Sequence, residues 1–197
     1  MAYLCVFVLL VTHETGHYIA GIFLGYKAKR VIIGGCKPSF AIVLNNTVFE
    51  ISPLIRRGEC GNAGHEMPDF NSAFKAFVFY IAGTLATISL STLAFIFLRF
   101  FRYPWAVPIY IFLMILSIDG IVPKADYCDG KAVLCIAKGC LFKQRGFHYI
   151  KNCYNTALSR GTVITFKMIH ILYLIISFSF FIYSFINIFI KQQNLAY

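Results

Sequence analysis

Four apolar segments dominate the sequence, and each is close to the length of about 20 residues that a helix needs to cross a bilayer. They cover about residues 2–25, 73–98, 104–123 and 166–190. Of all residues 59% are hydrophobic and only 13% are charged, which leaves more apolar surface than a soluble domain of this size can bury. The sequence therefore predicts one all-α integral membrane domain, residues 1–197, with about four transmembrane helices.

The basic residues predict how these segments are oriented. Most of the 18 lysines and arginines lie in or beside the two long connections, which follow the first and the third segment. The positive-inside rule then places both connections in the cytoplasm and both chain termini outside. The net charge of +10 is thus explained by topology, and we expect no nucleic-acid partner. We expect a multi-pass protein of the cell membrane, by default a bacterial plasma membrane.

The two connections are expected to contain structure of their own. In the first, β-branched residues alternate on either side of Asn45 and Asn46, a pair that tolerates the positive φ angles of a tight turn. This pattern predicts a membrane-associated β-hairpin at about 39–52, which either adds a strand to an extended peptide segment or simply covers the membrane surface. In the second connection, residues 131–142 are expected to form a short helix near the interface.

The first apolar segment carries the sequence HETGH at residues 13–17, an HExxH pattern. On a helix, residues i and i+4 share a face, so the imidazoles of His13 and His17 can bind one metal ion. Glu14 stands beside them as a candidate general base, because zinc lowers the pKa of a bound water toward neutrality. A glutamate within a membrane helix is costly unless it faces water or a metal. This cost favours a zinc site over simple polar contacts between helices.

A catalytic zinc site needs a third protein ligand from elsewhere in the chain. Three aspartates lie near the end of the third apolar segment or just after it, and two histidines are alternatives; the candidates are Asp119, Asp126, Asp129, His65 and His170. His148 lies in a polar stretch and is expected to be solvated. The residue types alone leave the choice among these candidates open.

With these motifs, the chain resembles the site-2 protease family of intramembrane zinc metalloproteases. In that family HExGH ends a membrane helix and a short β-structured segment follows, as in HETGHYIAGIFLGYKAKRVIIGG here. The second family motif, NxxPxxxxDG, is similar to GIVPKADYCDG, which matches at Pro123, Asp129 and Gly130. This stretch has one additional residue before the aspartate, and Gly120 stands where the family has asparagine.

The middle helix of the family often carries Gly-Pro-x-x-Asn. The corresponding stretch here is GTLAT, which retains Gly83 and places Thr84 and Thr87 at the other two positions. The resemblance covers roughly residues 5–135. Through the match to DG, it implies that Asp129 is the third zinc ligand, with Asp126 as the next choice.

The resemblance implies a zinc-dependent intramembrane endopeptidase that acts in regulated intramembrane proteolysis. His13, His17 and Asp129 would bind Zn²⁺, and Glu14 would act as general base and then as proton donor to the leaving amine. The substrate would be a transmembrane segment of a small membrane protein or peptide precursor in the lipid bilayer, with a possible regulatory membrane partner. The predicted topology puts the site toward the cytoplasm.

Two other functions stay open at this point. A catalytically silent relative would keep the fold and act as a membrane binding or assembly factor. The departures at Thr84, Thr87 and Gly120 keep this alternative open, whereas the retention of His13, Glu14 and His17 counts against it. A small ion-coupled transporter would use Glu14 and Asp119 to handle ions and would hold no zinc.

Overall fold

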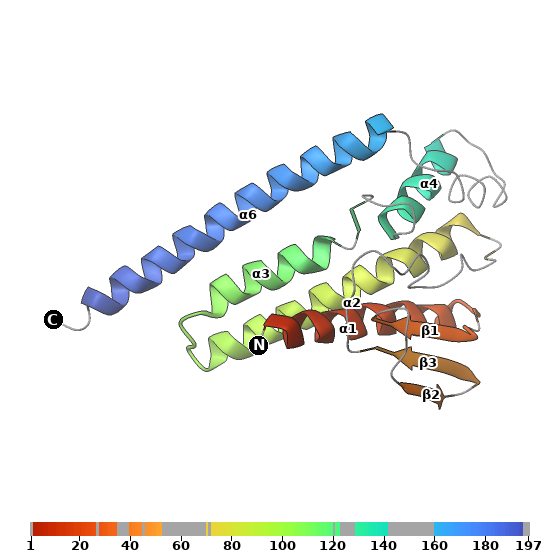
Figure 1. Cartoon of the computed structure of the whole chain (residues 1–197), viewed down its shortest axis with the longest axis horizontal. Coiled ribbons are helices and arrows are strands. Elements are labelled where there is room, and N and C mark those ends of the chain that lie inside the picture. Colours follow the sequence, from red (N-terminus) through yellow and green to blue (C-terminus); the bar gives the residue numbers. More distant parts are fainter. Residues whose placement is uncertain are drawn as a thin grey trace.

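The chain forms a layer of helices with a small β-sheet packed beside the first of them (Figure 1). The computed structural model describes residues 2–26, 28–34, 40–44, 46–52, 70, 72–119, 121–122, 129–141 and 160–194. Its helices are α1 (Ala2–Phe23), α2 (Ala73–Phe100), α3 (Ala106–Asp119), α4 (Asp129–Leu141) and α6 (Arg160–Asn194). The helix expected near 131–142 is confirmed as α4.

Three helices are long and apolar enough to cross a membrane: Leu4–Phe23, Ala73–Phe100 and Ile171–Ile190. They coincide with three of the four predicted spans. The fourth, predicted at 104–123, contains α3, which has 14 residues and therefore extends about 21 Å, less than the roughly 30 Å of a bilayer core. The structure thus supports three spanning helices, and a fourth span stays a prediction.

The chain turns sharply between α2 and α3, and this turn accounts for the late start of α3. Arg102 has a left-handed φ of 52°, and the Tyr103 N–H donates to the carbonyl oxygen of Leu98 at 2.9 Å. These features form a Schellman motif, which ends α2, and Pro104 then cannot continue a helix. The first residues of the predicted third span therefore belong to the turn.

The sheet has three strands: β1 (Arg30–Ile33), β2 (Phe40–Leu44) and β3 (Thr47–Ile51). Strands β2 and β3 pair antiparallel, and Asn46 in the turn between them has a φ of 63°. The predicted hairpin is therefore confirmed, within one residue at each end. Strand β1, which the sequence analysis did not predict, pairs parallel to β3, so the order is β1-β3-β2.

One face of the sheet packs against α1, while β2 stays outside this contact. Val31 and Ile33 of β1 are buried among side chains of α1, and the ring of Phe49 lies 4.9 Å from that of Tyr18. By contrast, all five residues of β2 are exposed, although its sequence FAIVL is entirely apolar. The strand at this edge thus presents apolar side chains on both of its faces.

The helices divide into a tightly packed group and an outlying one. Helix α2 packs on α1, α3 and α4, and α6 packs on α3 (Figure 1). The contact between α1 and α2 is close: a Cβ atom on Gly16 would lie 2.7 Å from the carbonyl oxygen of Ala82 and 2.7 Å from the Cβ of Ala86. Alanine and larger side chains are too big for this position, so Gly16 sets the distance between the two helices.

A second contact holds α4 against the first half of α2. Ala132, Cys135 and Ile136 of α4 are buried in one apolar cluster with Phe79 and Tyr80 of α2. This cluster fixes the first turn of α4, where Asp129 is located, relative to α2.

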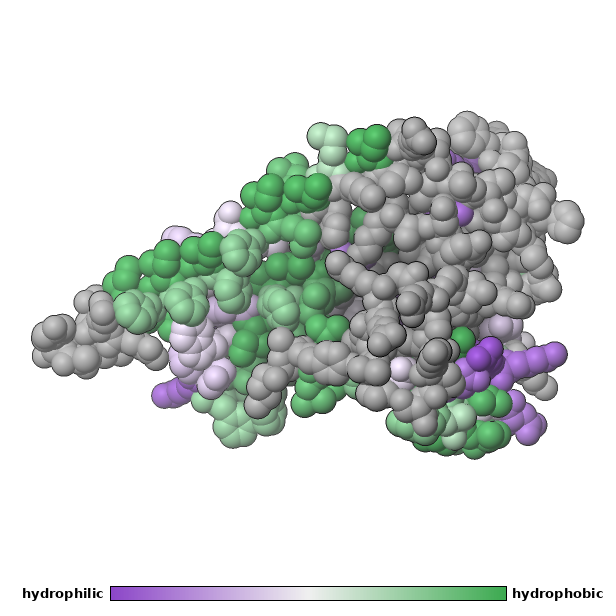
Figure 2. Space-filling view, viewed as in Figure 1, coloured by the Kyte–Doolittle hydropathy of each residue, from purple (hydrophilic) through white to green (hydrophobic). Residues whose placement is uncertain are grey.

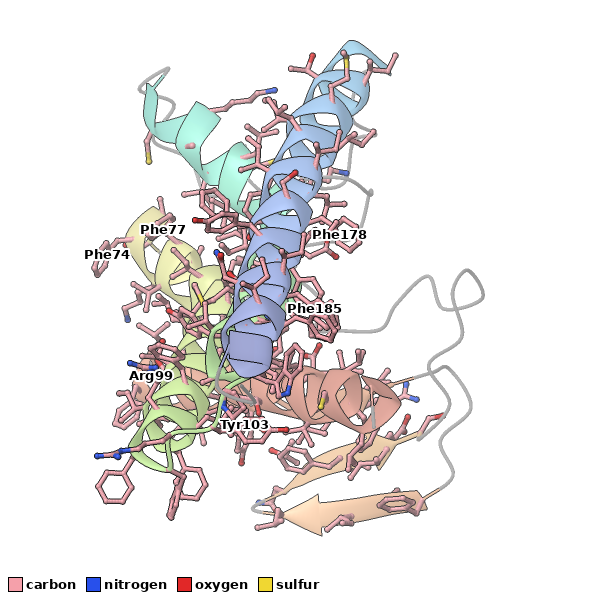
Figure 3. The ribbon with its side chains drawn as sticks, turned by 90° about the vertical axis from the view of Figure 1, so that its left-hand side faces the viewer. Phe74, Phe77, Arg99, Tyr103, Phe178 and Phe185 are labelled. Atoms are coloured by element: carbon pink, nitrogen blue, oxygen red, sulfur yellow. The ribbon has the colours of Figure 1, made fainter. Side chains whose placement is uncertain are left out.

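Helix α6 differs, because no residue between Ile171 and Ile190 is buried. An apolar surface runs along α6 and the neighbouring α3 (Figure 2). Phe178 and Phe185 extend from α6, as Phe74 and Phe77 do from the start of α2 (Figure 3). Such surface is what the acyl chains of a bilayer would cover.

Candidate metal centre

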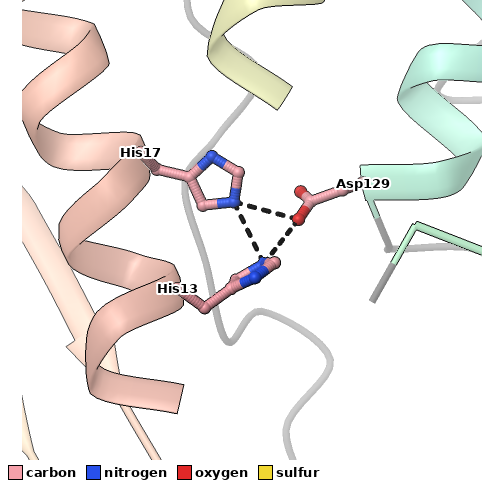
Figure 4. A group of neighbouring side chains, drawn as sticks. All are labelled: His13, His17 and Asp129. Atoms are coloured by element: carbon pink, nitrogen blue, oxygen red, sulfur yellow. Dashed lines mark hydrogen bonds and ion pairs between the residues drawn. The ribbon is translucent and has the colours of Figure 1, made fainter. Parts of the chain in front are cut away.

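Two histidines of α1 and the first residue of α4 converge on one point (Figure 4). Asp129 Oδ2 lies 2.8 Å from His13 Nε2 and 2.9 Å from His17 Nε2, and these two nitrogens are 3.2 Å apart. The histidines share a face because they are four residues apart on a helix. The aspartate comes from a position 112 residues beyond His17 and is brought there by the packing of α4 on α2.

The His17 ring is oriented by the backbone of α2. Its Nδ1 donates to the carbonyl oxygen of Phe79 at 2.7 Å, and the side chain is only 2% exposed. Because a carbonyl oxygen can only accept, the proton of the neutral ring is on Nδ1, and the lone pair of Nε2 faces His13 and Asp129. A backbone carbonyl that holds the remote ring nitrogen in this way is typical of metal-binding histidines.

The charge of Asp129 also suits a metal ligand. Burial of this carboxyl group raises its pKa, but when the Nε2 atoms of His13 and His17 carry a proton, their hydrogen bonds to the carboxylate outweigh that effect and hold the pKa well below its usual range. Asp129 is therefore ionised at neutral pH, which is the form that binds cations.

Helix α2 covers the two imidazoles at a residue without a side chain. A Cβ atom on Gly83 would lie 2.5 Å from His17 Nε2 and 2.9 Å from His13 Nε2, well inside contact distance. These are the two nitrogens that point at Asp129. Gly83 therefore keeps free the space in which the three donors meet.

Glu14 lies beside this cluster without belonging to it. Its side chain is buried, with 9% exposed, and its carboxylate interacts electrostatically with His17. A buried glutamate next to the donor group, on the same helix, is available for proton transfer there.

The other candidates for the third ligand are not in the cluster or lie outside the described residues. Asp119 ends α3 and is absent from the group of three. The backbone of His170 belongs to α6, but its side chain is outside the described part of the chain, as are Asp126, His65 and His148 entirely. Of the described aspartates and histidines, Asp129 is the one that joins His13 and His17.

The three donors fit a zinc ion. Two imidazole nitrogens and one carboxylate oxygen, all within 4.8 Å of one another, form a donor set found in catalytic zinc sites. Three protein ligands leave a coordination position for water or substrate. The convergence of these electron-pair donors, with the Nδ1 proton of His17 turned away, indicates a site for a cation.

Comparison with known proteins agrees with this geometry, since a model of peptidase family M50 matches residues 1–195. The chain belongs to peptidase family M50. This is the site-2 protease family, so the predicted resemblance is confirmed over nearly the whole chain, well beyond residues 5–135. Its members are zinc metalloproteases, and this M50 chain is accordingly a membrane metalloprotease. Neither the curated proteins nor the solved structures give a match.

One functional contact of the M50 site was missed by the sequence analysis. The carbonyl oxygen that orients His17 belongs to Phe79, and every residue type offers such an oxygen. Gly83 had been noted only as a remnant of the middle signature, whereas the structure places it against both imidazoles. The residue types in the sequence could therefore identify Gly83, but they could not identify the Phe79 carbonyl oxygen.

Proposed function

We propose that this M50 chain is a zinc-dependent intramembrane endopeptidase. It would hydrolyse a transmembrane segment of a small membrane protein or peptide precursor, as a step of regulated intramembrane proteolysis. The observation that carries the proposal is the convergence of His13, His17 and Asp129, with buried Glu14 beside them. The two histidines and Glu14 belong to a helix long enough to span a bilayer.

Each side chain of the site has a distinct role in this proposal. His13, His17 and Asp129 hold the zinc ion, which when bound supplies Lewis-acid activation of water and of the peptide carbonyl group. Glu14 takes a proton from the attacking water and then donates it to the nitrogen of the leaving amine. The water oxygen bonds to the carbonyl carbon, the C–N bond breaks, and its electron pair stays on that nitrogen.

The site requires water at membrane depth. Ionised Asp129 and buried Glu14 favour a polar environment, which in a bilayer exists only where protein or water surrounds such groups. We place the site toward the cytoplasmic side of the cell membrane, since the basic residues are concentrated in the connections next to it.

Strand β2 is a candidate contact for the substrate. Among the described strands it is at the edge of the sheet, next to β3, and all of its side chains are exposed and apolar. An unwound transmembrane segment is itself apolar and extended, so it can pair with this edge. In the exposed centre of β2, Val43→Lys should raise KM for such a substrate and leave kcat unchanged, because the metal centre is on other elements.

Zinc content and cleavage, measured on the same preparations, test the proposal. Purified wild-type protein in lipid nanodiscs should contain about one zinc per chain and should cleave members of a panel of synthetic transmembrane peptides. Glu14→Gln should keep the zinc and lose activity by about 10²–10⁴-fold, because it removes the proton carrier but none of the ligands. His17→Ala should lose both zinc and activity.

Asp119→Asn is the matched control, because this aspartate is outside the donor group. It should retain zinc and activity. A folded wild-type preparation that holds no zinc, although never exposed to a chelator, would overturn the proposal and favour the ion-coupled alternative, in which Glu14→Gln abolishes transport instead.

A further inference from the structure

Thr84 of α2 has a buried hydroxyl group without a hydrogen-bond partner. Its side chain is 3% exposed, and Oγ1 has no donor or acceptor among the residues that the structure describes. A buried polar group left in this state costs about 1–3 kcal/mol. This cost would be offset if the hydroxyl of Thr84 formed a hydrogen bond to a bound substrate.

The other hydroxyls in these helices show that the lack of a partner is unusual. The ordinary solution for serine or threonine in an apolar helix is a hydrogen bond to the carbonyl oxygen four residues earlier. Six residues of the described helices adopt it: Thr12, Thr15, Ser91, Thr92, Ser117 and Ser179. Thr87 donates instead to the carbonyl oxygen of Thr84. Thr84 itself does neither.

Thr84 follows Gly83 on α2, so it belongs to the part of this helix that covers the metal centre. A Cβ atom on its neighbour Gly83 would overlap the imidazoles of His13 and His17, and consecutive Cα atoms are about 3.8 Å apart. One turn earlier on the same face of α2, the ring of Tyr80 lies 6.5 Å from that of His17. Because side chains of a helix tilt toward its N-terminus, the Thr84 side chain leans toward the level of that contact.

From these observations we infer that Thr84 is a substrate-binding residue. Its hydroxyl donates a hydrogen bond to the carbonyl oxygen of the peptide bond that is cleaved, where negative charge develops as water attacks. The inference rests on the proposed protease function and adds to it a second, non-metal contact to the reacting group. It also gives a role to a position at which the chain departs from the family signature.

A pair of threonine variants on α2 tests the inference. Thr84→Val replaces the hydroxyl by a methyl group of similar size, and Thr87→Val makes the same change at a buried hydroxyl that already has an acceptor. Each variant is measured for zinc content, thermal stability, and kcat and KM toward the peptide that wild type cleaves best. Thr84→Ser serves as the conservative variant.

Thr84→Val should retain zinc and lose about 100-fold in kcat, the effect typical of removing one donor to a developing oxyanion. Its stability should be unchanged or higher, because the unpaired polar group is gone. Thr84→Ser should keep most of the activity. Thr87→Val should keep wild-type kcat and be slightly less stable, because a hydrogen bond is lost.

Two results would overturn the inference. If Thr84→Val has wild-type kcat, or if it loses activity only together with zinc and stability, the hydroxyl has a packing role and no contact with substrate. If wild type itself holds no zinc and cleaves no peptide, the proposed function fails, and the inference fails with it. Zinc content and cleavage by wild type separate these two failures.

Discussion

Helices α1 and α6 both contain a segment long and apolar enough to cross a membrane, but they pack in opposite ways. Helix α1 packs its His17 and Gly16 face against α2, and within its apolar sequence it buries a glutamate and a histidine. Helix α6 buries no residue over its spanning segment of 20 residues. Since lipid tails solvate leucine or phenylalanine as well as protein does, apolar side chains alone give membrane helices little reason to associate. Helices α1 and α2 are in close contact where Gly16 and Gly83 leave space and where the polar His17 is buried.

Among substitutions at the contacts of α1 and α6, the largest loss of zinc and activity should come from Gly83, where α2 lies against the imidazoles of α1. Gly83→Ala places a Cβ atom 2.5 Å from His17 Nε2, in the space that the metal would need. We expect the purified variant to contain little zinc and to lose at least about 100-fold in activity, as small displacements at reacting centres do. Leu85→Ala, at an exposed position of the same helix, should match wild type in both measurements. Normal zinc content in Gly83→Ala would contradict the assigned position of the metal.

A smaller loss is expected at the contact between α1 and α2 itself. In Gly16→Ala the new methyl group would lie 2.7 Å from Ala82 O and from Ala86 Cβ, so the helices must separate. Overpacking of this kind costs about 1–3 kcal/mol, to be measured as a lower free energy of unfolding in mixed micelles. Adding Ala86→Gly removes one of the two clashes and should restore part of the loss. An enlargement at exposed Leu93→Phe is the control and should cost nothing.

On α6 the corresponding effect should be weaker, because a single aromatic contact is affected, the one that joins this helix to the turn before α3. The rings of Phe185 and Trp105 lie 4.8 Å apart, a contact worth about 0.5–1.5 kcal/mol. We expect Phe185→Leu to lower thermal stability by that amount without changing zinc content. Phe178→Leu, at a more exposed position of α6, should change stability less. Loss of zinc in either variant would show that α6 contributes to the site.

The smallest effect is expected from the hydroxyl pair between α2 and α3. Ser91 Oγ and Ser117 Oγ are 3.3 Å apart, and hydrogen bonds between membrane helices average about 0.6 kcal/mol. Ser117→Ala should lower the free energy of unfolding by about this amount. Ser179→Ala is the matched control, because its exposed hydroxyl bonds to its own helix, and it should be neutral.

The sequence predicted those parts of the fold and site that depend on residue type. The hairpin followed from β-branched alternation around Asn46, and the histidine pair followed from HExxH spacing on a helix. Asp129 was identified through the DG match rather than through physical reasoning, since Asp119 and Asp126 are chemically equivalent to it. Only the packing of α4 on α2 distinguishes Asp129 from the described Asp119.

Other features depend on backbone geometry and could not be read from residue types. The four residues of β1 find their parallel partner, β3, 18 residues further along, and a run this short has little periodicity of its own. The start of α3 is set by the turn at Arg102 and Tyr103, and the residue type of Arg102 does not predict its left-handed φ. No sequence pattern identifies the carbonyl oxygen of Phe79 as the partner of His17, because every residue has such an oxygen.

The sequence separation of the three donors has a consequence for biosynthesis. His13 and His17 enter the membrane with the first helix, whereas Asp129 is translated more than one hundred residues later. A nascent chain that ends after α2 therefore still lacks the third donor. Under the proposed function, metal loading must wait for α4 to dock on α2, so proteolytic activity would arise only after the sequence of α4 has been translated.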